Sequence, residues 1–474
     1  MIKSGPAVQD EDFSRKWRTL QAVMLGTFIA PLDSSIVNTI LPSFTSIFHA
    51  DISLVQWIPT VYLLVICCLI LMFGRLGDMV GHKIIYLTGV GLFSVTSLFC
   101  GLSQNIWMLI TFRGFQGIAG AMLLSVGPAI VTSAFPARER GKALGVFTTS
   151  IAIALALGPT LGGMITEYLS WRFVFFINIP IGAFAVMFGL RTIPLGKRNK
   201  GQRLDWPGAI TLFIFLSSIL LYMNKAKDWG WSSAGSVMLL VCASVSGVWF
   251  IRTEKKAPQP MVDLDLFKNR VFALGNVSLL LNFIAAYTVV FLTPFYLTLI
   301  MKLPISRVGL VMATFPLVML VVSPLSGTIS DHIGYRVLTC SGMLICSFAM
   351  VLFSRLTDAN RMMDVVWYLL IFSLGTSAFM TPNSSAVMGS IPKKYLGIAS
   401  GILANMRSLG MILGIAISGA VFYNIAPTAL IRSHSILNND EIQKVLAGFH
   451  WAFVTAAVVA FSASITSFFS KNSS

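Results

Sequence analysis

Long apolar runs separated by short polar segments dominate the sequence. The runs hold about 20 residues, which is the length that an α-helix needs to cross the hydrocarbon core of a bilayer. They lie at residues 20–42, 54–73, 84–102, 106–135, 143–165, 173–193, 207–223, 234–251, 272–300, 308–328, 337–353, 365–388, 396–422 and 451–469. This pattern predicts an all-α polytopic membrane protein with about 14 transmembrane helices.

A polar signature between two of these runs occurs twice in the chain. Residues 74–83 read GRLGDMVGHK and residues 327–336 read GTISDHIGYR, with glycines and aspartate in the same frame. Such a long period indicates two homologous halves and not a short-repeat solenoid. We expect a six-helix bundle over 1–193, linkers with two additional transmembrane helices over 194–270, and a second six-helix bundle over 271–474.

The composition and the distribution of charge agree with a membrane protein. Hydrophobic residues make up 56% of the 474 residues and charged residues only 11%. If both termini are cytoplasmic, the inner loops and tails hold 23 of the 34 Lys and Arg residues and the outer loops hold 9. This bias predicts cytoplasmic termini and a place in the inner (cytoplasmic) cell membrane. Topology and anionic membrane lipids then explain the net charge of +16, so we expect no nucleic-acid partner.

One carboxylate, that of Asp33, lies deep in a predicted span. An ionised carboxylate at the bilayer centre costs roughly 2.5 to 3.5 kcal/mol even on a lenient scale, so it is seldom there without a task. We expect Asp33 to exchange a proton as the site opens to each side, and to attract a cationic substrate. The alternative is a structural hydrogen bond between helices.

Two basic residues, Arg113 and Arg407, also lie inside predicted spans, so each must face the interior of the protein. Arg113 is expected to tune the proton affinity of Asp33 or to form a purely structural tie. Arg407 is likewise expected either to tune the proton affinity of a site or to be structural. The second half offers no acid inside a span as its partner.

The two copies of the polar signature predict sharp cytoplasmic turns. Gly74 and Gly81 flank Asp78, whose carboxylate can pair with basic residues such as Lys83 or cap the next helix. We expect this loop to act as a gating latch between the halves, and Asp331 to have a weaker form of the same role.

A proline and three glycines occur close together in the fifth run. Gly158 and Pro159 are followed by Gly162 and Gly163. Proline bends a helix, and glycines let a facing helix approach closely. We expect a seam between the halves that seals the central path on one side.

These motifs resemble those of the major facilitator superfamily. Residues 74–83 are similar to its loop signature, 113–117 (RGFQG) to its fourth-helix motif and 158–163 (GPTLGG) to its antiporter motif. Residues 32–42 (LDSSIVNTILP) and 171–182 (WRFVFFINIPIG) resemble the fourteen-helix drug/proton antiporter group. The resemblance implies alternating access, and it places eight residues on spans expected to line the cavity: Asn38, Tyr62, Gln116, Tyr287, Phe291, Phe295, Tyr296 and Asn405.

The expected function is therefore multidrug efflux by antiport, in which lipophilic, cationic compounds leave in exchange for protons. A greasy cavity with few hydrogen-bonding groups suits such compounds better than sugars or phosphates. We expect no enzyme activity, no cofactor and no metal, because the sequence contains no GxxxxGK[ST] and no HExxH. We also expect a functional monomer. An exporter of a lipid or amphipathic metabolite, and a membrane sensor or scaffold that moves nothing, are the alternatives.

Overall fold

The computed structural model describes residues 16–136, 138–195, 205–256, 264–392, 396–426 and 439–470. These residues form helices and their connections, and none of them lies in a strand. Within these ranges, fourteen helices are long and apolar enough to cross a membrane. The predicted all-α polytopic fold with about 14 spans is confirmed.

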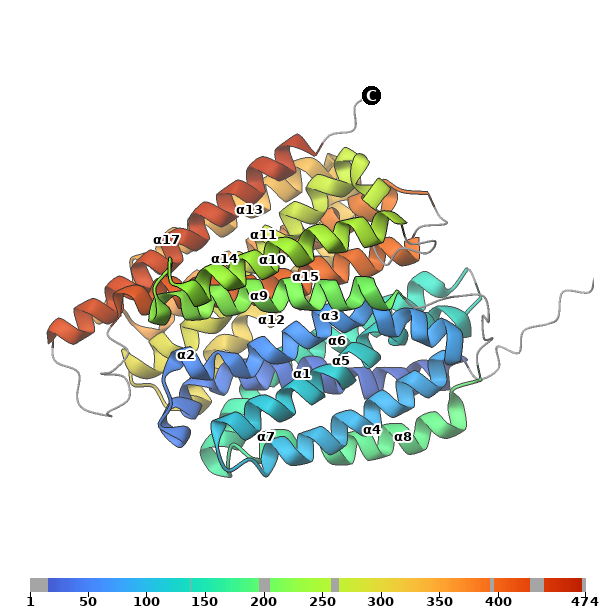
Figure 1. Cartoon of the computed structure of the whole chain (residues 1–474), viewed down its shortest axis with the longest axis horizontal. Helices are drawn as coiled ribbons and strands as arrows, with labels where there is room; N and C mark the ends of the chain where they lie inside the picture. Colours follow the sequence, from blue (N-terminus) through green and yellow to red (C-terminus); the bar gives the residue numbers. More distant parts are fainter. Residues whose placement is uncertain are drawn as a thin grey trace, which may run out of the picture.

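The first bundle lies in the lower half of Figure 1. Its central contacts join α1 with α6 and α8, α3 with α5, and α4 with α5 and α8. The helices are α1 (Lys16–Phe48), α2 (Ile52–Val55), α3 (Trp57–Val80), α4 (His82–Gly101), α5 (Ile106–Ala134), α6 (Arg140–Tyr168), α7 (Phe173–Phe176) and α8 (Asn178–Thr192).

The second bundle lies above the first in Figure 1. In it α13 packs between α14 and α17, and α11 packs on α15 and α17. The helices are α11 (Arg270–Leu299), α12 (Ile305–Ile333), α13 (Tyr335–Ser354), α14 (Met362–Gly389), α15 (Leu396–Ile425) and α17 (Asn439–Phe469). The two bundles meet where α6 packs on α12, α3 on α15 and α1 on α11.

A pair of helices, α9 (Trp206–Trp229) and α10 (Ala234–Lys256), lies along the junction of the bundles. The pair contacts both bundles through α9, which packs on α3 and on α15. A short 3-10 helix, η1 (Leu264–Lys268), precedes α11. Residues 196–204 and 257–263 of the expected linkers lie outside the described residues.

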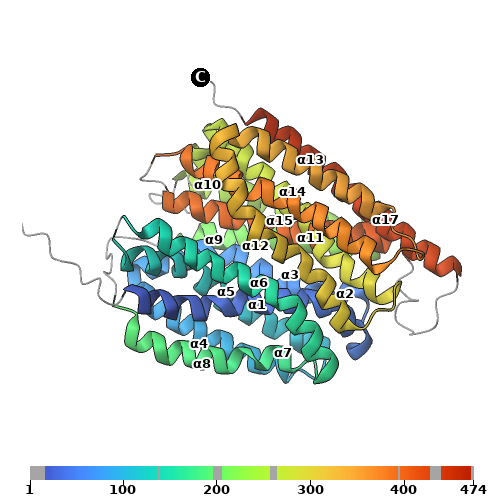
Figure 2. The same ribbon diagram turned by 180° about the vertical axis from the view of Figure 1, so that it is seen from behind.

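The spans alternate in direction, so α1 begins and α17 ends at the same end of the molecule (Figures 1 and 2). We call this the proximal end. The opposite end, where α6 ends and α12 begins, is the distal end. The polar signature at the end of α3 is proximal, as are the last turn of α10 and the first turn of α11.

Candidate functional site

Asp33 lies near the middle of α1, two residues after Pro31, and its side chain is completely buried. Three side chains donate hydrogen bonds to its carboxylate. Arg113 of α5 donates through Nη1 to Oδ2, Gln116 of α5 through Nε2 to Oδ1 at 3.3 Å, and Asn178 of α8 through Nδ2 to Oδ1 at 3.0 Å. The carboxylate thus joins three helices of the first bundle.

Further polar atoms surround Asp33 and Arg113. The Nη1 atom of Arg113 also donates to Oε1 of Gln116 at 2.6 Å, and the guanidinium carbon lies 4.2 Å from the ring centre of Tyr62. The Ser97 hydroxyl accepts hydrogen bonds from Gln116 at 2.8 Å and from Asn178 at 3.3 Å. We call Asp33, Ser97, Arg113, Gln116 and Asn178 the Asp33 network.

The Asp33 network matches an ionised carboxylate with a buried cation. Protonation of Asp33 would leave the Arg113 charge without its counter-ion in a low-dielectric interior, which is costly unless the side chain moves or water enters. A second acceptor is near, because Nε of Arg113 lies 3.4 Å from the Ile58 carbonyl oxygen of α3. A change in the charge of Asp33 would therefore act on Arg113 and on the helices that it joins.

Arg407 lies in a different environment, on the face of α15 that contacts α11. Its side chain is exposed, and its guanidinium carbon lies 5.5 Å from the ring centre of Phe283. Tyr287, one turn along α11, interacts with both Arg407 and Ser34 of α1. Within the described part of the chain, no carboxylate forms an ion pair with Arg407. We call Ser34, Phe283, Tyr287 and Arg407 the Arg407 cluster; it lies between the two bundles.

The glycine-rich part of α6 has two faces. A Cβ atom added at Gly158 would lie 2.5 Å from Cβ of Ser35, and one at Gly162 would lie 2.9 Å from Ile36, both on α1 of the same bundle. The expected seam between the halves is formed instead by the next face. There an added Cβ of Gly163 would lie 2.5 Å from the Ile305 carbonyl oxygen of α12. The reason is the helical period, since positions four apart share a face and positions five apart do not.

Pro159 belongs to the same face as Gly163, and an added Cβ of Gly309 on α12 would meet its carbonyl oxygen. Proline removes the backbone donor to the carbonyl four residues earlier, which is that of Leu155. The Ser35 hydroxyl of α1 donates to this carbonyl oxygen at 2.9 Å. The bent helix α6 is thereby fixed to α1, two residues from Asp33.

A second contact closes the distal end. Oε2 of Glu167, on α6, accepts a hydrogen bond from the backbone N–H of Ser306 at 2.8 Å, in the first turn of α12. At the proximal end of α6, by contrast, a Cβ added at Gly141 or Gly145 would meet no atom within 4 Å. In this conformation α6 and α12 are held together distally.

The polar signature is more helical than expected. Gly74 lies inside α3, which continues to Val80, and the chain reverses at Gly81, where φ is 113°. Such a φ favours glycine. The second copy reverses in the same way at Gly334, where φ is 84°. The first glycine of the signature therefore does not form the turn.

The charged residues of the signature make contacts within the first bundle. Oδ1 of Asp78 lies 3.1 Å from Nε2 of His82, and Nζ of Lys83 donates to the Leu190 carbonyl oxygen of α8 at 2.9 Å. Asp331 is exposed. A latch between the halves is not formed by these side chains in this conformation.

Arg75 of the same signature faces the central pair of helices. It interacts electrostatically with Glu254 of α10, with Asp205, which precedes α9, and with Asp78. Glu254 is buried, and both acids lie close to Gly208 of α9. No local sequence pattern indicates this cluster, because Asp205 and Glu254 are far from Arg75 in the chain.

The residues expected to line a cavity differ in exposure. Tyr287 is partly exposed, and Tyr62 and Gln116 belong to the buried surroundings of Asp33. Asn405 is buried in the contact of α15 with α3, where its Oδ1 accepts from the Cys67 thiol at 2.8 Å. The others are buried as well and do not face open space in this conformation: Asn38, Phe291, Phe295 and Tyr296.

Three residues with evident structural roles were not singled out from the sequence: Ser97, Glu167 and Asn178. Asn178 lies in the segment 171–182, and an amide at the start of a membrane helix was the available signal. Ser97 gave no signal, because serines are common in membrane helices. Glu167 lies near a helix end, where an acid needs no partner inside the membrane.

Comparison with known proteins identifies the family of this chain. Residues 23–415 match the family model of the Major Facilitator Superfamily. The chain belongs to this superfamily. It is accordingly a multi-pass membrane transporter, and its family and fold are not those of an enzyme.

Individual members of the superfamily cover most of the chain. The chain is 34% identical over 411 residues to the riboflavin transporter RibZ of Clostridioides difficile (strain 630). The aligned region covers 86% of this chain and 88% of RibZ. It is 31% identical over 406 residues to the multidrug resistance protein Stp of Mycobacterium tuberculosis (strain CDC 1551 / Oshkosh), with 85% and 75% covered. The multidrug transporter protein MdtP of Bacillus subtilis (strain 168) is 30% identical over 410 residues, with 86% and 75% covered.

Solved structures of superfamily transporters share the fold. A bacterial homologue of the human lysosomal transporter Spinster, in an inward-facing and occupied conformation, matches with a TM-score of 0.69 at 14% identity, over 95% of this chain and 96% of that one. At this identity the likeness concerns the fold alone.

Proposed function

We propose that this superfamily member is a proton-coupled secondary transporter that exports lipophilic small molecules by alternating access. The observation that carries the proposal is the Asp33 network, in which a completely buried carboxylate is paired with a completely buried arginine. Burying such a pair costs free energy, and one proton bound to the carboxylate leaves the arginine charge without its counter-ion. The proximal side is the cytoplasmic side, the membrane is the inner cell membrane, and the monomer is the functional unit.

The distal contacts of α6 and α12 support alternating access. They tie the bundles at one end through Gly163 and through the bond of Glu167 to Ser306. Opening toward the distal side requires these contacts to break and proximal ones to form. The loop signature at Asp78 and Arg75 lies where such proximal contacts would form. Asp331 occupies the corresponding position in the second half.

A lipophilic cation is the first candidate substrate, attracted by the Asp33 carboxylate when Arg113 moves away. Its support comes from the buried acid and from the multidrug transporters among the relatives. Aromatic side chains lie between the bundles at Phe283 and Tyr287, and aromatic surface suits such molecules.

A planar aromatic compound rich in hydrogen-bond acceptors is the second candidate. The Arg407 cluster favours it, because an exposed guanidinium beside Phe283 and Tyr287 can donate to carbonyl groups while rings stack nearby. A cation would be repelled by the same group. The similarity to a riboflavin transporter points in this direction.

Proteoliposomes with an imposed pH gradient test the proposed function and separate the two candidates. Transport of ethidium, a lipophilic cation, and of riboflavin is measured in wild-type protein and in Arg407→Gln. If wild-type protein transports riboflavin and Arg407→Gln loses this transport but keeps that of ethidium, the second candidate is supported. If wild-type protein transports ethidium but not riboflavin, the first candidate is supported. Binding of either probe without flux would favour a sensor or scaffold, and transbilayer movement of a labelled phospholipid would favour the lipid exporter.

A further inference from the structure

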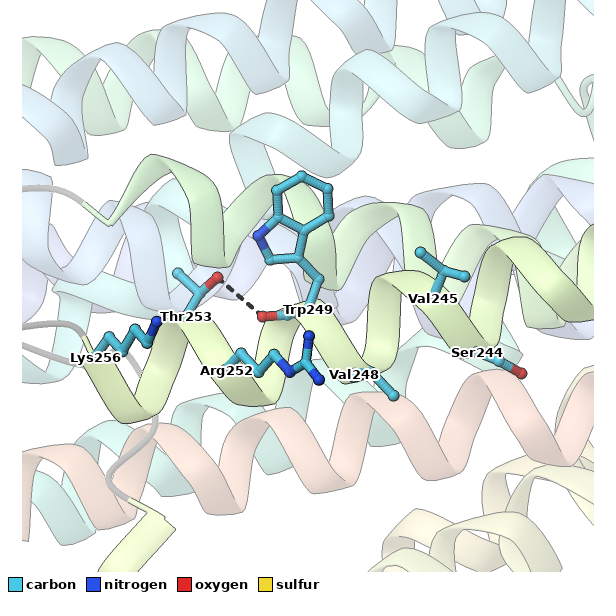
Figure 3. A pocket seen from close by; sticks show the side chains of 7 residues that line it. All are labelled: Ser244, Val245, Val248, Trp249, Arg252, Thr253 and Lys256. Carbon is cyan, nitrogen blue, oxygen red and sulfur yellow. Dashed lines mark hydrogen bonds between the residues drawn. The ribbon is translucent and has the colours of Figure 1, made fainter.

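The outer face of α10 carries a groove of about 660 Å³ near the proximal end. Figure 3 shows its lining, which comes from successive turns of this one helix. The distal part of the groove is apolar at Val245 and Val248, Trp249 lies in the middle, and Arg252 and Lys256 follow at the proximal end. The groove therefore changes from apolar to basic along the helix.

This face of α10 is exposed on the outside of the molecule. Of the fourteen spans, α10 has the smallest buried share, 17%. Trp249 is 62% exposed and Val248 is 51% exposed. The opposite face holds Ala243, Ser246 and Glu254, which are buried. In a bilayer, exposed apolar side chains of a spanning helix are covered by acyl chains.

Among the described residues that line the groove, none at its basic end is acidic. Arg252 and Lys256 are four residues apart and so lie on one face of the helix. Glu254 is two residues from each and points to the protein interior, where it interacts with Arg75. Asp265 of η1, also at this end of the molecule, is paired with Lys268 at 2.7 Å. The groove thus presents two cations above an apolar floor.

We propose that this groove binds an anionic phospholipid from the leaflet at the proximal end. The phosphate lies between Arg252 and Lys256, an acyl chain follows Val245 and Val248, and the Trp249 ring lies at the level of the glycerol backbone. Tryptophan is common at this depth of a membrane, and clustered basic residues at a membrane surface attract anionic lipids. The bound lipid stabilises the turn of α10 whose other face carries Glu254, which interacts with Arg75 of α3.

Quenching of Trp249 by brominated lipids tests the site in the full-length protein. The protein is reconstituted in phosphatidylcholine nanodiscs that contain increasing fractions of dibrominated phosphatidylglycerol or dibrominated phosphatidylcholine. The signal of Trp249 is the difference between wild-type protein and Trp249→Phe. We expect half-quenching at a mole fraction about fivefold lower, or lower still, for phosphatidylglycerol, since each basic side chain near an anionic surface contributes about that factor.

Charge variants separate a site from general attraction. Arg252→Gln with Lys256→Gln should abolish the preference, while Lys255→Gln, which removes a charge of the same turn outside the groove, should leave it unchanged. Equal quenching by the two lipids in wild-type protein, or equal loss in Lys255→Gln, would overturn the proposal. If the double variant does not purify as a single species, Arg252→Gln and Lys256→Gln are each compared with Lys255→Gln under the same criteria.

Discussion

Arg113 of α5 donates a hydrogen bond to Asp33 of α1, and both side chains are completely buried. The pair lies inside the first bundle and not between the bundles, so it holds the geometry of that bundle directly. Gln116 and Asn178 are the other two donors to the carboxylate. A change in the charge of Asp33 is therefore felt by α1, α5 and α8 together.

Removing Arg113 alone should destabilise the protein more than removing the pair. Arg113→Gln leaves a buried carboxylate without its counter-ion, a loss of about 3–5 kcal/mol, and the transition temperature should fall. Adding Asp33→Asn removes the uncompensated charge and should restore much of the loss. Thermal unfolding in detergent, followed by tryptophan fluorescence, measures both. Equal destabilisation of the single and the double variant would mean that packing, and not charge, dominates.

The distal seam should tolerate no side chain at Gly163. Gly163→Ala places a methyl group about as close as 2.5 Å to the Ile305 carbonyl oxygen, and overpacking of this kind typically costs about 1–3 kcal/mol. We expect a shift toward distal opening, read as increased labelling of a cysteine introduced at Ser306 by an impermeant maleimide. Gly145→Ala is the control on the same helix, where an added methyl group meets no atom. Indistinguishable labelling of the two variants would argue against a seal at Gly163.

The two copies of the loop signature should differ in importance. Asp78 contacts His82 and lies within the electrostatic environment of Arg75, whereas Asp331 is exposed. Asp78→Asn should therefore reduce the initial rate of transport more than Asp331→Asn at matched expression. Initial rates in vesicles decide the point, and equal losses would contradict the asymmetry.

Membrane sidedness follows from the distribution of charge. Asp358→Cys, in the distal connection between α13 and α14, should react with impermeant maleimide in intact cells. Arg138→Cys, in the proximal connection between α5 and α6, should react only after permeabilisation. The opposite labelling pattern would contradict a cytoplasmic proximal end.

The sequence was sufficient to predict the spans, because a run of about 20 apolar residues has the length and composition of a transmembrane helix. It also predicted Asp33 and Arg113 as members of a site, since buried charges are costly and rare. The helical period also separates Gly163 from the face of Gly158 and Gly162, whereas the packing of α12 on the Gly163 face comes from the structure.

Other features depend on contacts between distant segments. The pairing of Arg75 with acids beside α9 and α10 requires the central pair to lie against α3, which no local pattern indicates. The burial of Tyr296 depends on its contacts with Phe449 and Thr357 within the second bundle. The exposure of Arg407, between the bundles, depends on how the bundles are tilted in one conformation. Residue type and spacing do not predict that tilt.

The most direct test of proton coupling is transport by Asp33→Asn in proteoliposomes with an imposed pH gradient and no other energy source. Asparagine keeps the shape and the hydrogen-bond acceptor of the side chain but cannot take up the proton. The thermal unfolding transition in detergent shows that the variant is folded, and Asp33→Glu serves as the titratable control with partial activity. We predict that Asp33→Asn builds no substrate gradient, while wild-type protein does; a gradient of wild-type size in Asp33→Asn would contradict coupling through this carboxylate.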